Sequence, residues 1–185
     1  PNTYEFYWDT SAKAFAERMQ KEYKAFWNEK RREKATAQGL TPEQVMILAS
    51  IVQKETYMTD ERPTIAGVYL NRLKERMPLQ ADPTVVYAIK ETTGNYDTII
   101  KRVYIKDTQI ASPYNTYQIQ GLPPAPIAMP DISSIEAVLS PKEHEYLFFV
   151  ADTARIGYHK FARTLQEHNK NRQAYRKWLD RIMTN

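Results

Sequence analysis

One carboxylate in this sequence stands where an apolar side chain is expected. Residues 41–56 predict a helix, because Thr41 can cap its start, Pro42 suits its first turn and Gln44 lies three residues after the cap. On a helical wheel at roughly 100° per residue, Glu55 falls inside the apolar arc of this helix. The residues that form the arc are Val45, Leu48, Ala49, Ile51 and Val52.

The position of Glu55 suggests acid chemistry. A carboxyl group on an apolar face loses hydration, and its pKa rises because the charged form is disfavoured. A carboxylic acid that stays protonated near neutral pH is what general-acid catalysis requires. Two other placements fit the same pattern: Glu55 pairs with a buried arginine such as Arg62 or Arg72, or it emerges where the helix frays.

Further polar candidates lie between residues 80 and 117. Asp82, which precedes Pro83, is a start signal for a helix through about Lys90, and a capping carboxylate can still offer its second oxygen to a ligand. Residues 113–130 hold five prolines, which exclude a helix, so we expect an extended segment that contacts a ligand, straps the core, or does both. The candidates that could accompany Glu55 are Gln80, Asp82, Asn115 and the tyrosines Tyr87, Tyr114 and Tyr117.

Other chemistries lack their signatures. The sequence contains no GxGxxG, P-loop or GxSxG motif, and no cysteine. Its three histidines are not paired at a metal-binding spacing, so we predict no metal site and no cofactor. His144, between two glutamates, is expected to be exposed. His159, near Tyr158 and Phe161, could line a cleft or be a satisfied structural histidine, whereas His168 could point either way.

Composition limits the protein class. The chain has 185 residues, 42% of them hydrophobic, and a net charge of +4, as expected for one globular domain. Basic runs such as residues 30–32 resemble solvated helix faces, so we expect no nucleic-acid partner. No apolar run of about 18 residues and no signal peptide occurs. The chain begins without methionine, so we expect it to be part of a longer protein.

The predicted elements define an α+β domain covering residues 1–185. We expect a strand over 3–8, a helix over 12–29, and a charged helix extension or linker over 28–38. A helix over 63–76 should pack against the one that carries Glu55. A short helix over 133–139, a buried strand over 146–150 with a hairpin partner over 157–161, and a final helix after a Thr164–Glu167 capping box complete the chain.

Several motifs resemble a known family. Residues 49–56 (ASIVQKET), 68–73 (VYLNRL) and 79–85 (LQADPTV) are similar, in order, to motifs of the MltG (YceG-like) endolytic murein transglycosylases. Residues 114–124, 146–152 and 159–169 resemble the later motifs, and residues 1–4 resemble the opening of the domain. Two departures are Gln53, where many members carry glutamate, and Ala81, where members often have a hydroxyl residue.

The resemblance implies a helical catalytic region with a small sheet, and a groove that binds glycan strands. It implies cleavage of the MurNAc–GlcNAc β-1,4 bond of peptidoglycan with a 1,6-anhydro-MurNAc end, and it puts the catalytic glutamate on Glu55. Asn71 and His159 join the polar candidates as expected substrate contacts. A parent protein anchored in the bacterial inner membrane, with a LysM-like region and this domain outside the cytoplasm, is also implied, with peptidoglycan synthases as candidate partners. Alternatives are a muramidase and a non-catalytic glycan-binding module.

Overall fold

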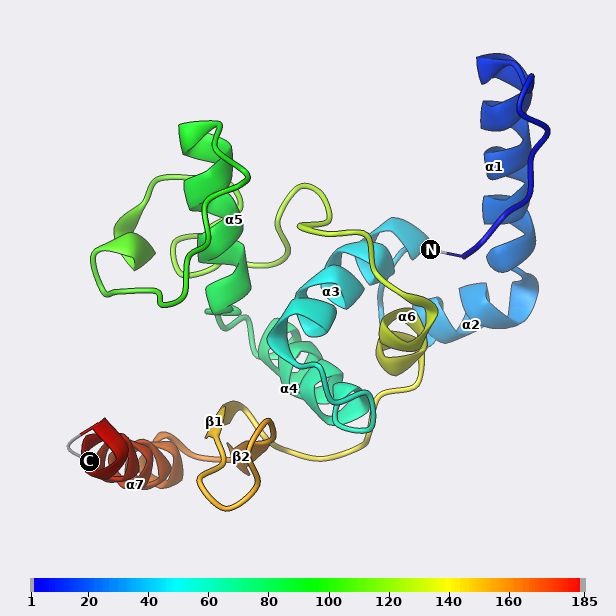
Figure 1. Cartoon of the computed structure of the whole chain (residues 1–185). Helices are drawn as coiled ribbons and strands as arrows, with labels where there is room; N and C mark the ends of the chain where they lie inside the picture. The colour runs from blue at the N-terminus through cyan, green and yellow to red at the C-terminus, as the bar shows by residue number, and fades with distance from the viewer. Residues whose placement is uncertain (1, 184–185) are drawn as a thin grey trace.

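The computed structural model describes residues 2–183 and has an α+β architecture, as predicted (Figure 1). Its described residues form seven α-helices, one short 3-10 helix (η1) and one two-stranded antiparallel sheet. No helix in this part of the chain combines the length and the apolar character needed to cross a bilayer. The elements are α1 (Ala12–Phe26), α2 (Glu29–Ala37), α3 (Pro42–Glu55), α4 (Arg62–Lys74), α5 (Asp82–Thr93), η1 (Asp107–Gln109), α6 (Ile132–Leu139), β1 (Phe148–Ala151), β2 (His159–Ala162) and α7 (Leu165–Met183).

The core is built where α3, α4 and α6 pack together. Helix α3 starts with the predicted capping box: the Thr41 hydroxyl accepts from the Gln44 backbone N–H, and the Gln44 side chain accepts from the Thr41 N–H. Every residue of its predicted apolar stripe is fully buried. Because burial of a helix face, more than local propensity, holds a helix in place, this packing fixes the end of α3 and with it Glu55.

Helix α5 starts differently from the prediction. Ala81, not Asp82, is the N-cap residue, and no side chain caps the helix. The Asp82 carboxylate instead accepts a hydrogen bond from the Tyr117 hydroxyl at 2.7 Å. The helix start is held by Thr84 and Thr116, two buried threonines whose hydroxyls lie 2.8 Å apart. This pairing joins α5 to the proline-rich segment 113–130, which contains no helix, as predicted.

The predicted hairpin is present near the C-terminus. β1 and β2 pair antiparallel with Phe149 opposite Phe161, and α7 packs against both strands. The prediction of a strand buried on both faces was wrong, because all four β1 residues are only half-buried in this small two-stranded sheet. The capping box of α7 is partial: the Glu167 N–H donates to the Thr164 hydroxyl, but the Glu167 carboxylate accepts from Arg163.

The N-terminal predictions need correction. Residues 3–8 form no strand, and Trp8 is 99% exposed, because no neighbouring strand is available to pair with this segment. The predicted helix over 12–29 ends at Phe26, since Asn28 caps a separate helix α2 through residue 37. Figure 1 shows α1 projecting away from the body, in keeping with its lack of buried residues. Pro1, the first residue of the family-like opening, lies outside the described residues.

One glycine marks the tight contact between α4 and the segment before the hairpin. A Cβ added to Gly67 would lie 2.7 Å from the Lys142 carbonyl oxygen and 2.7 Å from His144 Nε2. His144, expected to be exposed, is half-buried, and its Nε2 lies 2.9 Å from the Thr64 carbonyl oxygen. This close approach is possible only because residue 67 has no side chain.

We therefore expect Gly67→Ala to destabilise the protein, although alanine is the better helix former. Overpacking should outweigh helix propensity and lower the free energy of unfolding by about 1–2 kcal/mol. Denaturant unfolding measures this, with Lys74→Ala on the exposed side of α4 as a control that should stay within about 0.5 kcal/mol of the parent. An unchanged or raised stability of Gly67→Ala would contradict the packing.

Candidate active site

Glu55 is the last residue of α3, half-buried against α4. The Tyr69 hydroxyl of α4 donates a hydrogen bond to Glu55 Oε2 at 3.0 Å. Burial raises the pKa of Glu55 to about 7, although the Tyr69 hydrogen bond and the charges of His159 and Arg72 act in the opposite direction. Desolvation dominates, so at neutral pH a large share of Glu55 carries its proton.

Neither arginine pairs with Glu55. Arg62 forms a salt bridge with Asp131, with the nearest atoms 2.8 Å apart. Arg72 donates to backbone carbonyls, at 2.7 Å to Leu147 and at 3.0 Å to both Pro78 and Leu79. The alternative in which a buried arginine neutralises Glu55 was therefore wrong, and its carboxyl stays available to a ligand.

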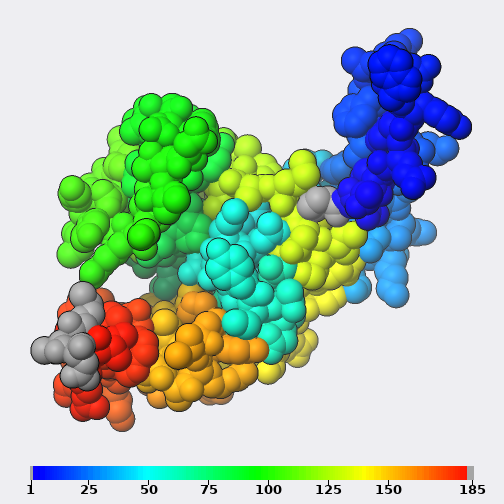
Figure 2. Space-filling view, viewed as in Figure 1, coloured from blue at the N-terminus to red at the C-terminus, as the bar shows by residue number. Residues whose placement is uncertain are grey.

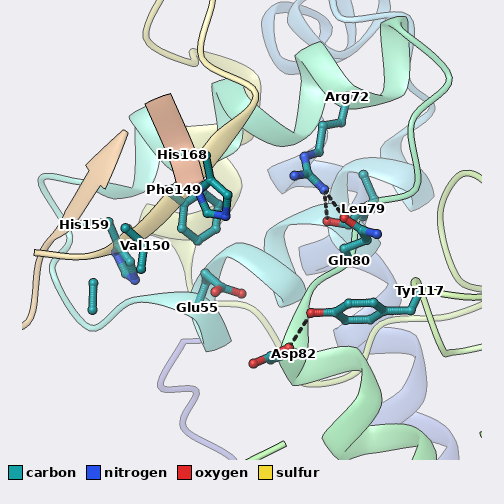
Figure 3. A pocket seen from close by; sticks show the side chains of 11 residues that line it. Glu55, Arg72, Leu79, Gln80, Asp82, Tyr117, Phe149, Val150, His159 and His168 are labelled. Atoms are coloured by element: carbon teal, nitrogen blue, oxygen red, sulfur yellow. Dashed lines mark hydrogen bonds between the residues drawn. The ribbon is translucent and has the colours of Figure 1, made fainter. Parts of the chain in front are cut away.

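Glu55 opens into a first cavity of about 270 Å³ between α3, the loop before α5, and the hairpin (Figure 3). Gln80 projects into it from a left-handed backbone conformation with a φ of 51°, which is uncommon outside glycine. The Asp82–Tyr117 pair lines the side opposite Phe149 and the histidines in Figure 3. The residues that line the first cavity are Glu55, Arg72, Leu79, Gln80, Asp82, Tyr117, Phe149, Val150, Ala151, His159 and His168.

A second cavity, of about 830 Å³, adjoins the first. It lies beside α5 and the loop that follows, with Tyr57, Tyr87 and Tyr96 in its lining. Glu55 and Asp82 line both cavities, so the two meet at these carboxyl groups. Figure 2 shows the surface hollowed between the green segment containing α5 and the orange and red C-terminal elements. An extended ligand could therefore run past Glu55 from one cavity into the other.

Two histidines line the first cavity. His159 Nδ1 lies 2.8 Å from Glu61 Oε2, and its backbone N–H donates to the other carboxylate oxygen of Glu61. It is therefore both a cleft residue and a structurally satisfied one. His168 stacks on Phe148, and its buried Nδ1 has no hydrogen-bond partner among the described residues. Burial lowers the pKa of His168, so the ring is kept neutral beside the cavity.

Comparison with known proteins identifies the fold and its relatives. The sequence profile of the YceG-like family matches residues 1–174. The chain belongs to the YceG-like family. A crystal structure at 2.6 Å of a YceG-like protein from Listeria monocytogenes matches with a TM-score of 0.75 and 39% identity, over 92% of this chain and 53% of that one.

Two named YceG-like relatives are endolytic murein transglycosylases. The one from Bacillus subtilis (strain 168) is 44% identical over 131 residues, which cover 71% of this chain and 34% of that protein. The one from Streptococcus pneumoniae (serotype 2, strain D39) is 36% identical over 135 residues, covering 73% of this chain and 24% of that protein. The chain thus matches about a third or less of the length of these relatives.

The structure brings together only some of the residues that the YceG-like motifs suggested. Gln80, Asp82, Tyr117 and His159 line the first cavity with Glu55, and Tyr87 lines the second. The remaining three lie outside both. Tyr114 packs on Tyr87 at 4.6 Å between ring centroids. Asn71 and Asn115 donate their side-chain amides to backbone carbonyls, of His144 and Tyr146 and of Thr108 and Ile110 respectively.

Both asparagine amides therefore hold main-chain segments together, and the structure places neither residue in the cavities where we expected substrate contacts. Asn115 is fully buried and holds the turn that precedes Tyr117. Asn71 ties α4 to the segment leading into β1. In both residues the side-chain NH2 group donates to two main-chain oxygens, a role that asparagine can fill and aspartate cannot.

The candidates chosen from the sequence left out several residues of this YceG-like site, among them Tyr69, Arg72, Phe149 and His168. Tyr69 and Arg72 lie on the inner face of α4. From the sequence alone, the tyrosine looks like an ordinary core residue and the arginine like an ion-pair partner for an acidic residue. Phe149 and His168 reach the cavity from the hairpin and α7, which are distant in sequence. The three-residue spacing of Tyr69 and Arg72, both on one helix face, was the available signal.

Gln53, which departs from the YceG-like pattern, does not line either cavity. Its side-chain oxygen accepts from the Asp131 backbone N–H, and its amide nitrogen donates to the Met129 carbonyl at 3.3 Å. A glutamate here could accept the first bond but could not donate the second. Glutamine in place of glutamate at residue 53 thus changes how α3 contacts the start of α6. In the motif over residues 49–56, Glu55 is then the acidic residue, and it faces the cavities.

The raised pKa of Glu55 predicts a pH-dependent stability. The folded state binds the proton more tightly than the unfolded chain, so this contribution is fully present below the ordinary glutamate pKa of 4.5 and is lost as pH rises through about 7. When the pH is raised from about 4 to about 8, the free energy of unfolding of Glu55→Gln should therefore rise by about 2–3 kcal/mol relative to that of the parent. Urea unfolding at the two pH values measures it.

Two variants control this measurement. Glu43→Gln alters an exposed acid at the other end of α3 whose pKa is lowered, mainly by a backbone hydrogen bond, so its pH trend should be small and opposite in sign. Tyr69→Phe removes a donor that stabilises the Glu55 carboxylate, so the carboxyl signal of Glu55 should titrate at higher pH by NMR. A constant difference between Glu55→Gln and the parent across this range would show that Glu55 is an ordinary acid.

Proposed function

We propose that this chain is the catalytic part of a peptidoglycan lytic transglycosylase that cuts glycan strands internally. The observation that carries the proposal is a half-buried carboxyl group with a pKa of about 7 at the meeting point of two cavities. The names of the two relatives support the substrate, since both are called endolytic murein transglycosylases. An arrangement in which the groove continues on both sides of the acid suits a bond in the middle of a strand.

Glu55 acts twice in the proposed reaction at the MurNAc–GlcNAc β-1,4 bond. Its protonated carboxyl first donates the proton to the glycosidic oxygen, and the bond from that oxygen to C1 of MurNAc breaks. The resulting carboxylate then takes the proton of the C6 hydroxyl of the same MurNAc, whose oxygen bonds to C1. The products are a 1,6-anhydro-MurNAc end and a free GlcNAc hydroxyl, no water is consumed, and Glu55 regains its proton.

The residues around Glu55 would stabilise the charges that develop during the reaction and position the sugar. Tyr69 donates to the carboxylate that forms after the first step, so its hydrogen bond favours the departure of the proton. Asp82, held by Tyr117, places negative charge where an oxocarbenium-like sugar would develop positive charge. Gln80 and His159 offer hydrogen bonds to sugar hydroxyls, and Tyr87 offers a ring face in the second cavity.

A muramidase is the second candidate, and one observation favours it. Asp82 is a second carboxylate lining both cavities with Glu55, and hydrolases of glycosidic bonds commonly use two carboxyl groups. Such an enzyme would release a reducing MurNAc, which is heavier than the anhydro sugar by one water molecule. The mass of the product therefore separates the two reactions.

The wider protein belongs to the proposal as well. We propose that residues 1–185 form one catalytic domain of a longer protein that carries a membrane anchor and a LysM-like region. In this arrangement the domain would face peptidoglycan outside the bacterial cytoplasmic membrane, with synthases as candidate partners. The two relatives are roughly three to four times as long as the segments that match this chain, which supports a longer protein.

Glu55→Gln should abolish strand cleavage, with a loss of at least about 10²–10⁴-fold, because glutamine cannot donate the proton. Purified sacculi are digested with the parent chain and with the variant, and the soluble fragments are weighed by mass spectrometry. The parent should release fragments ending in anhydro-MurNAc.

Glu43→Gln is the matched control, since it removes an exposed acid from the same helix and should leave the rate unchanged. Normal release of anhydro fragments by Glu55→Gln would exclude Glu55 as the acid. Fragments with reducing MurNAc ends would favour the muramidase, and sacculus binding without any fragment would favour a glycan-binding module.

A further inference from the structure

The second cavity has a chemical character that the cleavage reaction leaves unexplained. Four cationic side chains line it: Lys54, Lys90, Lys101 and Arg102. Among the described residues, the carboxyl groups in its lining are Glu55 and Asp82, both at the end shared with the first cavity. Glu91 and Asp97, the acids nearest along the chain, are not part of the lining. The cavity away from Glu55 is therefore a cationic arm of the groove.

These cations have no acidic partner in the described part of the chain. None of the salt bridges there includes any of the four. Lys90 donates to the Tyr96 carbonyl, and the Arg102 guanidinium lies 5.5 Å from the centre of the Tyr104 ring. By contrast, Arg72 in the first cavity is committed to three carbonyls. Of the two cavities that meet at Glu55, the second is therefore the one whose described cations are available to an anion.

The proposed reaction places such an anion nearby. The sugar attacked at C1 is MurNAc, whose lactyl group carries a peptide with free carboxylates. If Glu55 protonates the bond of that sugar, its stem peptide begins beside Glu55 and must leave through one of the two adjoining cavities. The first cavity offers about 270 Å³ and the second about 830 Å³. Size and charge both direct the stem into the second.

We propose that the cavity lined by Lys54, Lys90, Lys101 and Arg102 binds the carboxylates of a stem peptide, so that the chain selects strands that still bear peptides. This specificity rests on the proposed function above. Ile99, Ile100 and Val103 line the same cavity and would contact the apolar parts of the peptide. Lys101 and Arg102 are exposed on the loop after α5, so they can adapt to the ligand.

The test compares strands that bear stem peptides with strands from which an amidase has removed them. Lys101→Gln/Arg102→Gln should lower kcat/KM on stem-bearing strands about five- to tenfold more than on bare strands, as expected for two partly solvated ion pairs. Lys21→Gln/Lys24→Gln removes the same charge from exposed positions on α1 and should change neither rate. Thermal melting confirms that both variants fold.

A binding measurement separates this inference from the proposed function. Soluble stem-bearing and bare oligosaccharides are titrated onto Glu55→Gln, with and without the Lys101→Gln/Arg102→Gln change. Tighter binding of the stem-bearing form, lost with the two cations, supports the inference even if no strand is cut. Equal binding of both forms would overturn it.

A third substrate identifies the source of the anion. Hydrofluoric acid removes phosphodiester-linked polymers from strands and leaves the stems in place. The preference for stem-bearing strands should survive this treatment. Loss of the preference would show that the cationic arm binds phosphate groups, and it would overturn the stem-peptide inference.

Discussion

The site depends on the balance between desolvation of Glu55 and the hydrogen bond from Tyr69. Burial favours the protonated carboxyl group, whereas the donated hydrogen bond and nearby cations favour the charged form. Desolvation outweighs the opposing interactions, so the pKa of Glu55 lies at about 7, above the ordinary glutamate value of 4.5. A group that must give a proton and take one back needs this intermediate value, because either extreme would slow one of the two steps.

Helix α4 sets this balance and also shapes the cavity. Tyr69 reaches α3, and Arg72, three residues later, reaches the Leu147 carbonyl before β1 and the carbonyls of Pro78 and Leu79 before α5. Three walls of the first cavity are thus tied to one helix. Since Arg72 donates to main-chain oxygens of irregular segments, its guanidinium fixes backbone and forms no ion pair with Glu55, although its charge still favours the carboxylate form.

The sequence allowed much of the helical framework to be predicted, because each signal was local. The capping box of Thr41, the apolar stripe of α3 and the Pro83 start of α5 need only neighbouring residues. Glu55 was predictable for the same reason, since its anomaly lies within one helix. Predictions that depended on distant contacts were weaker. The strand over 3–8 had β-favouring residues but no partner, and β-propensity expresses packing against neighbours more than a backbone preference.

The site beyond Glu55 shows the same limit. Asn71 and Asn115 lie in family-like motifs, and sequence alone does not reveal that their amides bind carbonyls of other segments. Phe149 reaches the cavity because the hairpin lies beside α4, where Phe149 meets Tyr69 edge to face, and His168 reaches it because α7 packs on the hairpin. A motif shows which residues a family keeps. Only the hydrogen-bond partners of each side chain in the structure show whether that residue holds the fold or is open to a ligand.

The two carboxyl groups at the junction illustrate how environment divides roles between similar side chains. Glu55 is half-buried and receives one hydrogen bond from Tyr69, whereas Asp82 lies at the exposed start of α5 and accepts one from Tyr117. The pKa of Tyr117 is raised by its own burial and by Asp82, so its hydroxyl stays a donor to that carboxylate. The negative charge of Asp82 also raises the pKa of Glu55. Desolvation is the main cause of the raised pKa of Glu55 and the charge of Asp82 adds to it, so the more exposed carboxylate supports the role of the more buried one as a proton donor.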